Sequence, residues 1–143
     1  YRNQRPRQGG YFVASAKVFS SWTELRAEWL GGGSDPSVEI YLEQSELKKL
    51  PQDWAVKGTV DSPAKVIQMK ADTAGEESWV VESPRAGFFV RPVLFEPAWR
   101  CRLNGAVVPL VAAHGLFQAV WLPAAGRYTL DFKYQPFSRD MGA

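Results

Sequence analysis

Residues 97–136 constrain the fold more than any other part of the chain, because apolar and polar residues alternate there around an Asn104-Gly105 dipeptide. This dipeptide between two alternating runs is a strong signal of a β-hairpin, since a two-residue type I′ turn needs a positive φ at both positions. Arg100 and Arg102 are expected on one face of the hairpin. On the other face we expect three opposed pairs, which are Leu103 with Ala106, Cys101 with Val108, and Trp99 with Leu110.

The end of this segment repeats the alternation. One face of the last strand is expected to carry Tyr128, Leu130, Phe132 and Tyr134, and the other Arg127, Thr129, Asp131 and Lys133. Residues 97–136 therefore predict four consecutive short strands. Further candidate strands are residues 11–19, 38–43, 55–60, 64–70, 78–82 and 87–95. Many short strands with turn signals roughly 8–12 residues apart favour an all-β fold, which we expect to be an antiparallel, jelly-roll-like β-sandwich.

One short α-helix is predicted near the N-terminus, after Ser20. Ser21 and Glu24 have the spacing of a capping box, in which each side chain bonds the other residue's backbone N–H. Trp22, Leu25 and Trp29 would form its apolar stripe. Residues 31–33, all glycine, are expected to end this helix, and residues 45–50 are expected to form a single helical turn before Pro51.

The length of 143 residues and the 45% hydrophobic content indicate one globular domain. We assign residues 11–136 to a single β-sandwich domain. Residues 1–10 are expected to be a flexible arm and residues 137–143 a tail. Because the chain begins without methionine, we expect it to be a piece of a longer protein.

The balance of charge disfavours nucleic acid as a partner. The chain has seventeen basic and fifteen acidic residues, and the two kinds are mixed along it, so no basic stripe suits a phosphate backbone. No apolar run reaches the roughly 18–20 residues of a membrane span. The lone cysteine, Cys101, excludes an intrachain disulfide and is expected to be a small buried residue on the inward face of its strand.

The chain is poor in groups that could converge for catalysis. His114 is the single histidine and is expected to be exposed in a loop between two strands. A glycosidase would need two carboxylates flanking a sugar bond, but the candidates are better explained as solvated strand and turn positions; they are Glu76, Glu77, Glu82, Glu96 and Asp131. We predict no catalytic, cofactor-binding or metal-binding residue in this chain.

Aromatic residues are the remaining resource for binding. Six tryptophans, five tyrosines and eight phenylalanines exceed the evident needs of such a core, and flat aromatic faces can stack on sugar rings. We single out Trp79, Trp99 and Trp121 as candidate ligand contacts. Adjacent residues on a strand point to opposite faces, as Phe88 and Phe89 do, and Val120 and Trp121. One residue of each pair could therefore point outward, where it would either pack against another layer or partner or be exposed as a site.

The same segment resembles the end of YfhO-type bacterial membrane proteins. The matching motifs are Pro97-Ala98-Trp99, Asn104-Gly105, Gly115-Leu116-Phe117, residues 122–126 (Leu-Pro-Ala-Ala-Gly) and Tyr134-Gln135-Pro136. Upstream, Asp35-Pro36 and the following residues 38–43 resemble the family as well, so the likeness spans most of residues 11–136. Two departures are Ala98, where the family has glycine, and one extra alanine in the turn at residues 124–126.

The resemblance implies a soluble, extracytoplasmic β-sandwich domain inserted before the final transmembrane helix of a multi-spanning protein. Such proteins are similar to glycosyltransferases that use lipid-linked sugar donors. Their catalytic acids would lie in the membrane part, so no family catalytic residue carries over to this chain. The implied partners are the transmembrane segments of the parent protein and a cell-envelope glycan.

Two functions follow and stay open at this point. The domain contacts the glycan or its acceptor, in which case two or more of Trp79, Trp99 and Trp121 should face solvent around one groove. Alternatively, it is a structural domain that packs on its membrane portion or on a partner. An independent lectin or hydrolase is disfavoured by the single histidine and the unpaired carboxylates.

Overall fold

The computed structural model describes residues 10–31, 39–52, 54, 65–73 and 75–135, with only the backbone described for residues 65 and 67–73. The expected strand at 55–60, the arm at 1–9 and the tail at 137–143 lie outside these residues. The elements in chain order are β1 (Tyr11–Val13), β2 (Ala16–Phe19), α1 (Trp22–Leu30), β3 (Ile40–Glu43), the 3-10 helix η2 (Gln44–Lys49), β4 (Lys65–Thr73), β5 (Glu76–Ser83), β6 (Gly87–Leu94), β7 (Trp99–Leu103), β8 (Ala106–Val108), β9 (Val111–Ala113), β10 (Phe117–Leu122) and β11 (Gly126–Tyr134).

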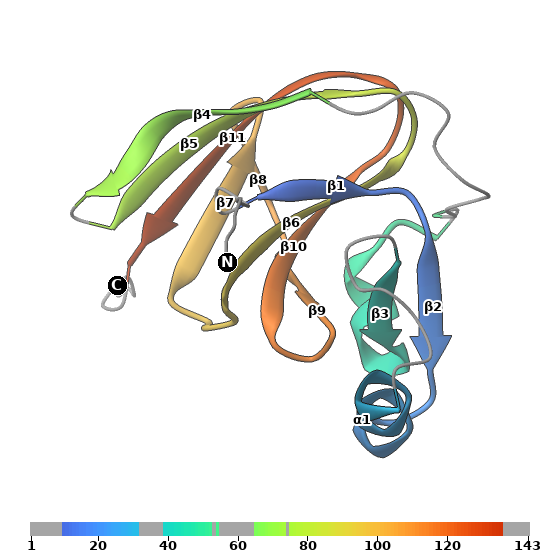
Figure 1. Cartoon of the computed structure of the whole chain (residues 1–143). Helices are drawn as coiled ribbons and strands as arrows, with labels where there is room; N and C mark the ends of the chain where they lie inside the picture. The colour runs from blue at the N-terminus through green and yellow to red at the C-terminus, as the bar shows by residue number, and fades with distance from the viewer. Residues whose placement is uncertain (1–9, 32–38, 53, 55–64, 74, 136–143) are drawn as a thin grey trace, which may run out of the picture.

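The strands form two antiparallel sheets that pack as a sandwich, which confirms the predicted all-β fold with one short α-helix (Figure 1). The four-stranded sheet has the order β1-β6-β10-β9, and the five-stranded sheet has the order β4-β5-β11-β7-β8. A separate parallel pair, β2 with β3, lies beside the four-stranded sheet together with α1. This parallel pair is the one departure from the expected antiparallel pairing.

The predicted hairpin forms around Asn104 and Gly105, whose φ angles are 51° and 90°. The Asn104 side chain also accepts a hydrogen bond of 2.8 Å from the Thr129 N–H, which ties the turn to β11. Two of the three expected pairs are present, Leu103 with Ala106 and Cys101 with Val108.

The third expected pair, Trp99 with Leu110, does not form, so this prediction is wrong. Strand β8 ends at Val108, because Pro109 has no N–H to donate to a ladder. The chain then crosses to the other sheet, where β9 begins at Val111. Residues 97–136 therefore contain five strands divided between two sheets rather than four.

Helix α1 begins at the predicted cap, but only one of the two hydrogen bonds of the expected capping box is present. The Ser21 hydroxyl accepts a bond of 3.2 Å from the Glu24 N–H, as expected. The Glu24 carboxylate, however, accepts from the N–H and hydroxyl of Ser20, at 3.3 and 2.7 Å. Of the expected stripe, Leu25 is fully buried and Trp29 half-buried, while Trp22 remains 39% exposed.

The first expected strand, at 11–19, is divided between two sheets. Its first part is β1, which pairs with β6 in the four-stranded sheet, and its second part is β2, which pairs with β3. The single helical turn expected at 45–50 is the 3-10 helix η2.

The four-stranded sheet is the middle layer of the molecule and is buried on both faces. Phe89 and Val120 pack in the cluster between the sheets, with Leu130 and Phe132 of β11. Phe88, on the opposite face, is also fully buried, and packs with Ile40 of β3. The apolar residue that the sequence predicts to point away from the core is thus covered by a further layer rather than by solvent.

A buried ion pair between Arg91 and Glu77 joins the two sheets. Arg91 of β6 has no exposed surface, and its guanidinium contacts both carboxylate oxygens of Glu77 of β5 at 2.7 and 3.2 Å. Arg91 also donates to the Gln118 side chain at 2.8 Å. The rings of Trp99 and Phe132 lie 4.2 and 4.9 Å from its central carbon. We call this ion pair the buried bridge.

Breaking one side of the buried bridge is expected to be far more harmful than removing both. Arg91→Met leaves the Glu77 carboxylate in the core without its positive partner, so we expect a loss of about 3–5 kcal/mol in the free energy of unfolding. The double variant R91M/E77L replaces the pair with apolar side chains and should recover most of that loss. Urea unfolding measures both.

The matched control is the pair of Arg127 and Glu82, which is 3.6 Å apart and largely exposed. Arg127→Met should cost less than about 1 kcal/mol, because solvent screens such pairs. An Arg91→Met variant no less stable than Arg127→Met would contradict the role of the bridge.

Candidate functional site

Trp79 lies in the core, where a surface ligand does not reach it. Its side chain is 1% exposed, and its ring centroid is 5.3 Å from that of Phe89. Its indole N–H donates to Glu77 at 2.6 Å, as part of the buried bridge. The three tryptophans singled out from the sequence therefore do not surround one groove.

Trp99 and Trp121 are half-buried and line two hollows at the crossover from β8 to β9. The first hollow, of about 510 Å³, has Trp99, Phe95 and Leu110 in its wall. The second, of about 240 Å³, has Trp121 and Leu103. The two share Lys49, Val108 and Pro109, so we call them the crossover hollows.

Lys49 is the fixed polar element of the crossover hollows. Its ammonium donates to the Leu110 carbonyl at 3.2 Å and pairs with Glu46 at 2.9 Å. It also lies 4.7 Å from the centre of the Phe95 ring, a cation–π contact. The walls are otherwise mostly apolar, so the hollows suit an apolar face of a ligand better than a charged group.

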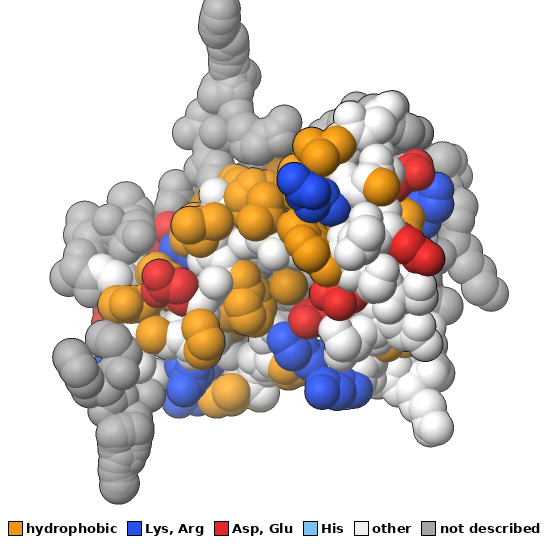
Figure 2. Space-filling view, turned by 90° about the horizontal axis from the view of Figure 1, so that it is seen from below, with side chains coloured by type: hydrophobic (Ala, Val, Ile, Leu, Met, Phe, Trp, Pro, Cys, Tyr) orange, Lys and Arg blue, Asp and Glu red, His pale blue; other side chains and the backbone are white. Residues whose placement is uncertain are grey.

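A second surface, the apolar end, consists of Trp22, Leu94 and Leu116, which are 39%, 62% and 37% exposed. They come from α1, the end of β6 and the β9–β10 turn. The ring of Trp22 lies against Gly115, and the Leu116 carbonyl accepts from the N–H of Phe95 at 2.7 Å. Figure 2 shows hydrophobic side chains gathered over this side of the molecule, with charged side chains among them.

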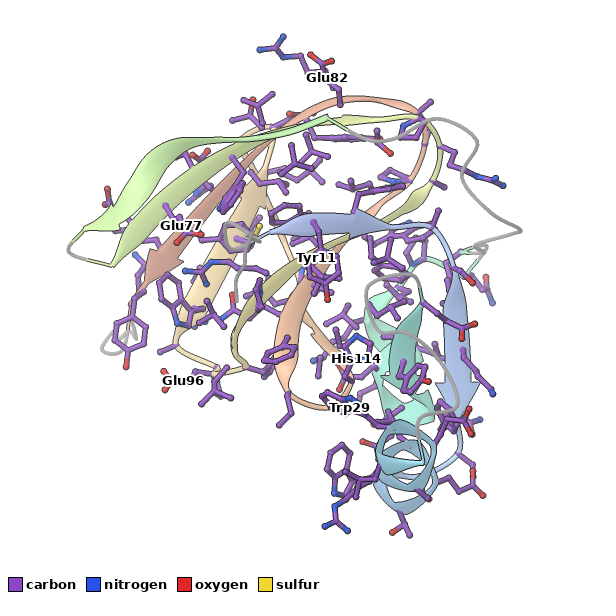
Figure 3. All side chains as sticks on the ribbon, in the orientation of Figure 1. Tyr11, Trp29, Glu77, Glu82, Glu96 and His114 are labelled. Carbon is purple, nitrogen blue, oxygen red and sulfur yellow. The ribbon has the colours of Figure 1, made fainter. Side chains whose placement is uncertain are left out.

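His114 lies in the turn between β9 and β10, as predicted, but it is buried, so the predicted exposure is wrong. It has no exposed surface, and its φ of 57° places it in a tight left-handed turn before Gly115. The imidazole Nδ1 of His114 accepts from the Tyr41 backbone N–H at 3.3 Å, and the backbone N–H of His114 donates to the Tyr41 carbonyl at 2.7 Å. The turn is covered because α1 and β3 pack on it, and the rings of Trp29 and Tyr41 lie 5.2 and 5.3 Å from the imidazole (Figure 3).

Of the five carboxylates considered for a catalytic pair, Glu76, Glu77 and Asp131 line one groove on the five-stranded sheet, whereas Glu82 and Glu96 lie outside it. Glu77 belongs to the buried bridge, Glu82 pairs with Arg127, and Figure 3 shows Glu77, Glu82 and Glu96 in separate parts of the molecule. Glu76 pairs with Lys133 at 3.6 Å, and Asp131 accepts from Ser78 at 2.6 Å. Glu77 departs from the expectation of a solvated position, since it is 7% exposed. In the described part of the chain, no three His, Cys, Asp or Glu side chains are grouped closely enough to hold a metal ion.

Cys101 is fully buried, as predicted, on the inward face of β7. The pKa of its thiol is raised to about 12, mainly by burial and also by the nearby Asp131 charge, against a lowering effect of Arg91. A thiol held in this neutral form is a poor nucleophile, so Cys101 acts as a packing residue.

Sequence reasoning missed the residues that join the sheets. Arg91 stands two positions after Phe89 on β6, and so on the same face as that core residue. This position was the available signal for a buried arginine, whereas its partners Glu77 and Gln118 are set by the packing of separate strands.

None of the helices in the described residues has the length and apolar character that a membrane crossing requires. Comparison with known protein families, with curated proteins and with solved structures found no match for this chain.

The raised pKa of Cys101 predicts a pH dependence of stability. Between pH 9 and 12 the unfolded chain releases the thiol proton while the folded chain retains it, so stability falls as the pH rises. Titration of this thiol should lower the free energy of unfolding by about 1.4 kcal/mol for each pH unit in this range, and should not lower it below pH 9. Urea unfolding over this range measures it.

Cys101→Ala is the control, because it removes the thiol and leaves every other titrating group in place. The free energy of unfolding of the variant should therefore fall less steeply between pH 9 and 12. Equal slopes for the two proteins would contradict the burial of a neutral thiol.

Proposed function

We propose that this chain is a non-catalytic, extracytoplasmic β-sandwich domain of a YfhO-type multi-spanning bacterial membrane protein, which packs on the membrane portion of its own protein. The resemblance of residues 97–136 supports the parent protein, and the membrane portion would carry the glycosyltransferase-like chemistry. The apolar end supports the packing role.

The apolar end has the chemistry of a surface that rests at a lipid–water interface. Trp22 presents an indole, which has an apolar body and a polar N–H, and Leu94 and Leu116 present aliphatic side chains. The three residues come from separate elements that are held together by Gly115 and by the bond from Phe95 to Leu116. A patch built in this way is rigid, so docking does not have to order it first.

The jelly-roll-like form of the sandwich belongs to the same proposal. The chain passes repeatedly from one sheet to the other, as in β5 to β6, β6 to β7 and β10 to β11. The β6–β7 and β9–β10 connections lie on the side that carries the apolar end (Figure 1).

Vesicle binding tests whether the apolar end contacts the lipid surface, as it would in a domain that rests at the membrane beside the transmembrane segments. The chain is mixed with vesicles of three parts phosphatidylethanolamine to one part phosphatidylglycerol, and the bound fraction is measured by cosedimentation. The variant W22S/L94S/L116S should bind about a hundredfold more weakly, because each half-exposed side chain contributes roughly 1 kcal/mol when it is buried.

The matched control is V18S/V107S/Y134S, which removes three other exposed apolar side chains, 42%, 62% and 41% exposed. This control should bind as the unchanged chain does. Equal loss in both variants, or no binding by the unchanged chain, would overturn the proposal.

A second candidate function, contact with a cell-envelope glycan, is favoured by the crossover hollows. They place two half-buried indoles, Trp99 and Trp121, on either side of Val108 and Pro109, with Lys49 shared between them. Aromatic faces of this kind stack on the C–H faces of sugar rings. Trp79 takes no part in this candidate site, because it lies in the core.

Tryptophan fluorescence separates this candidate from a purely structural role. Titration with neutral cell-envelope oligosaccharides should change the emission of the chain, and the change should be lost in Trp99→Ala and Trp121→Ala. It should persist in Trp22→Ala, which removes an exposed indole outside the hollows. A response that survives both hollow variants would refute the site.

A further inference from the structure

The outer face of the five-stranded sheet carries a polar groove that neither proposed role uses. The groove has a volume of about 670 Å³ and is lined by side chains of β5, β7, β8 and β11. Two rows of residues cross it in the register of the sheet. They are Arg102-Asp131-Ser78 and Arg100-Lys133-Glu76.

The guanidinium groups of Arg100 and Arg102 hydrogen-bond to backbone carbonyls. Arg102 donates to the Gly105 carbonyl at 3.3 Å, and Arg100 donates to the carbonyls of Pro97 and Trp99. Within the described residues neither guanidinium has an ion-pair partner, whereas Lys133 in the same groove pairs with Glu76. The two arginines stand two positions apart on β7, so their Cα atoms are about 7 Å apart on one face.

Asp131 lies next to Arg102 in the ladder and faces the same groove. One of its oxygens accepts from the Ser78 hydroxyl at 2.6 Å. In the described part of the chain its other oxygen has no hydrogen-bond partner. A carboxylate in this position accepts hydrogen bonds from hydroxyl groups and repels a purely anionic chain.

From this arrangement we propose that the groove binds an acidic saccharide, with a uronate carboxylate on Arg100 and Arg102 and ring hydroxyls on Asp131. The planar guanidinium fork matches a carboxylate in bidentate geometry. Asp131 favours a ligand that carries hydroxyl groups beside its carboxylate, because the Asp131 oxygens accept hydrogen bonds from O–H groups and repel the oxygens of a bare phosphate. The groove lies apart from the apolar end, and it shares Arg100 and Val107 with the first crossover hollow. Its proposed ligand is charged and its test uses other probes, so this proposal and the glycan proposal can fail separately.

Calorimetric titration of the chain with trigalacturonic acid tests the site, with the fully methyl-esterified trisaccharide as the uncharged form of the same scaffold. The acid should bind and the ester should bind at least about tenfold more weakly, since the loss of charge-assisted bonds removes that much affinity. Added salt should weaken binding of the acid, because the groove is open to solvent.

The variant R100Q/R102Q should reduce affinity for the acid by about tenfold or more. R26Q/R127Q is the matched control, because it removes the same charge from two exposed arginines outside the groove. Equal loss in the two double variants would mean that only net charge matters, and would overturn the site. Absence of binding by the unchanged chain would overturn it as well.

Asp131→Ala separates a saccharide site from a simple anion site. Because the variant lacks an acceptor for hydroxyl groups, its affinity for trigalacturonic acid should fall. Because it also lacks a negative charge, its affinity for inorganic phosphate should rise. Opposite changes for the two probes support the proposal. Tighter binding of both probes in this variant would show that the groove selects charge alone, and would refute the assignment to a saccharide.

Discussion

The buried bridge between Arg91 and Glu77 is the interaction on which the rest of the sandwich depends. A guanidinium with no exposed surface needs a partner for its charge and acceptors for its donors, because solvent cannot supply them. Glu77 from one sheet and Gln118 from the other meet these needs at 2.7 and 2.8 Å. A slip of one residue in the register of β5 or β6 would turn one partner out of the core, so the bridge fixes how the two sheets face each other.

Burial of both faces of the four-stranded sheet decides where function can lie. One face of that sheet packs on the five-stranded sheet, and the other on β3 and its neighbours. In the described residues, the surfaces left for partners include the strand ends, the exposed side of α1 and the outer face of the five-stranded sheet. The proposed sites follow this division: the apolar end is formed by α1, the end of β6 and the β9–β10 turn, the crossover hollows lie where the chain passes from β8 to β9, and the polar groove lies on the outer face.

Local patterns predicted the parts of the fold that depend on neighbouring residues. The Asn104-Gly105 turn, the alternation along β11 and the Ser21 cap were expected, and all three are present. Of the site residues, Cys101 was placed correctly, but Trp79 and His114 were not. Trp79 appeared available because one strand does not reveal which face is covered. His114 appeared exposed because its turn is covered by α1 and β3, which are distant in sequence.

The sequence by itself determined the Asn104-Gly105 turn, the start of α1 and the two faces of β11, since a turn that needs positive φ, a capping side chain and a period of two are all local properties of the chain. Only the tertiary structure decided that the chain crosses sheets at Pro109, that Arg91 meets Glu77, and that Trp22 lies beside Gly115. These contacts join residues whose separation in sequence carries no periodic signal, and they form because close packing and charge neutralisation act between layers. The candidate surfaces owe their positions to such contacts.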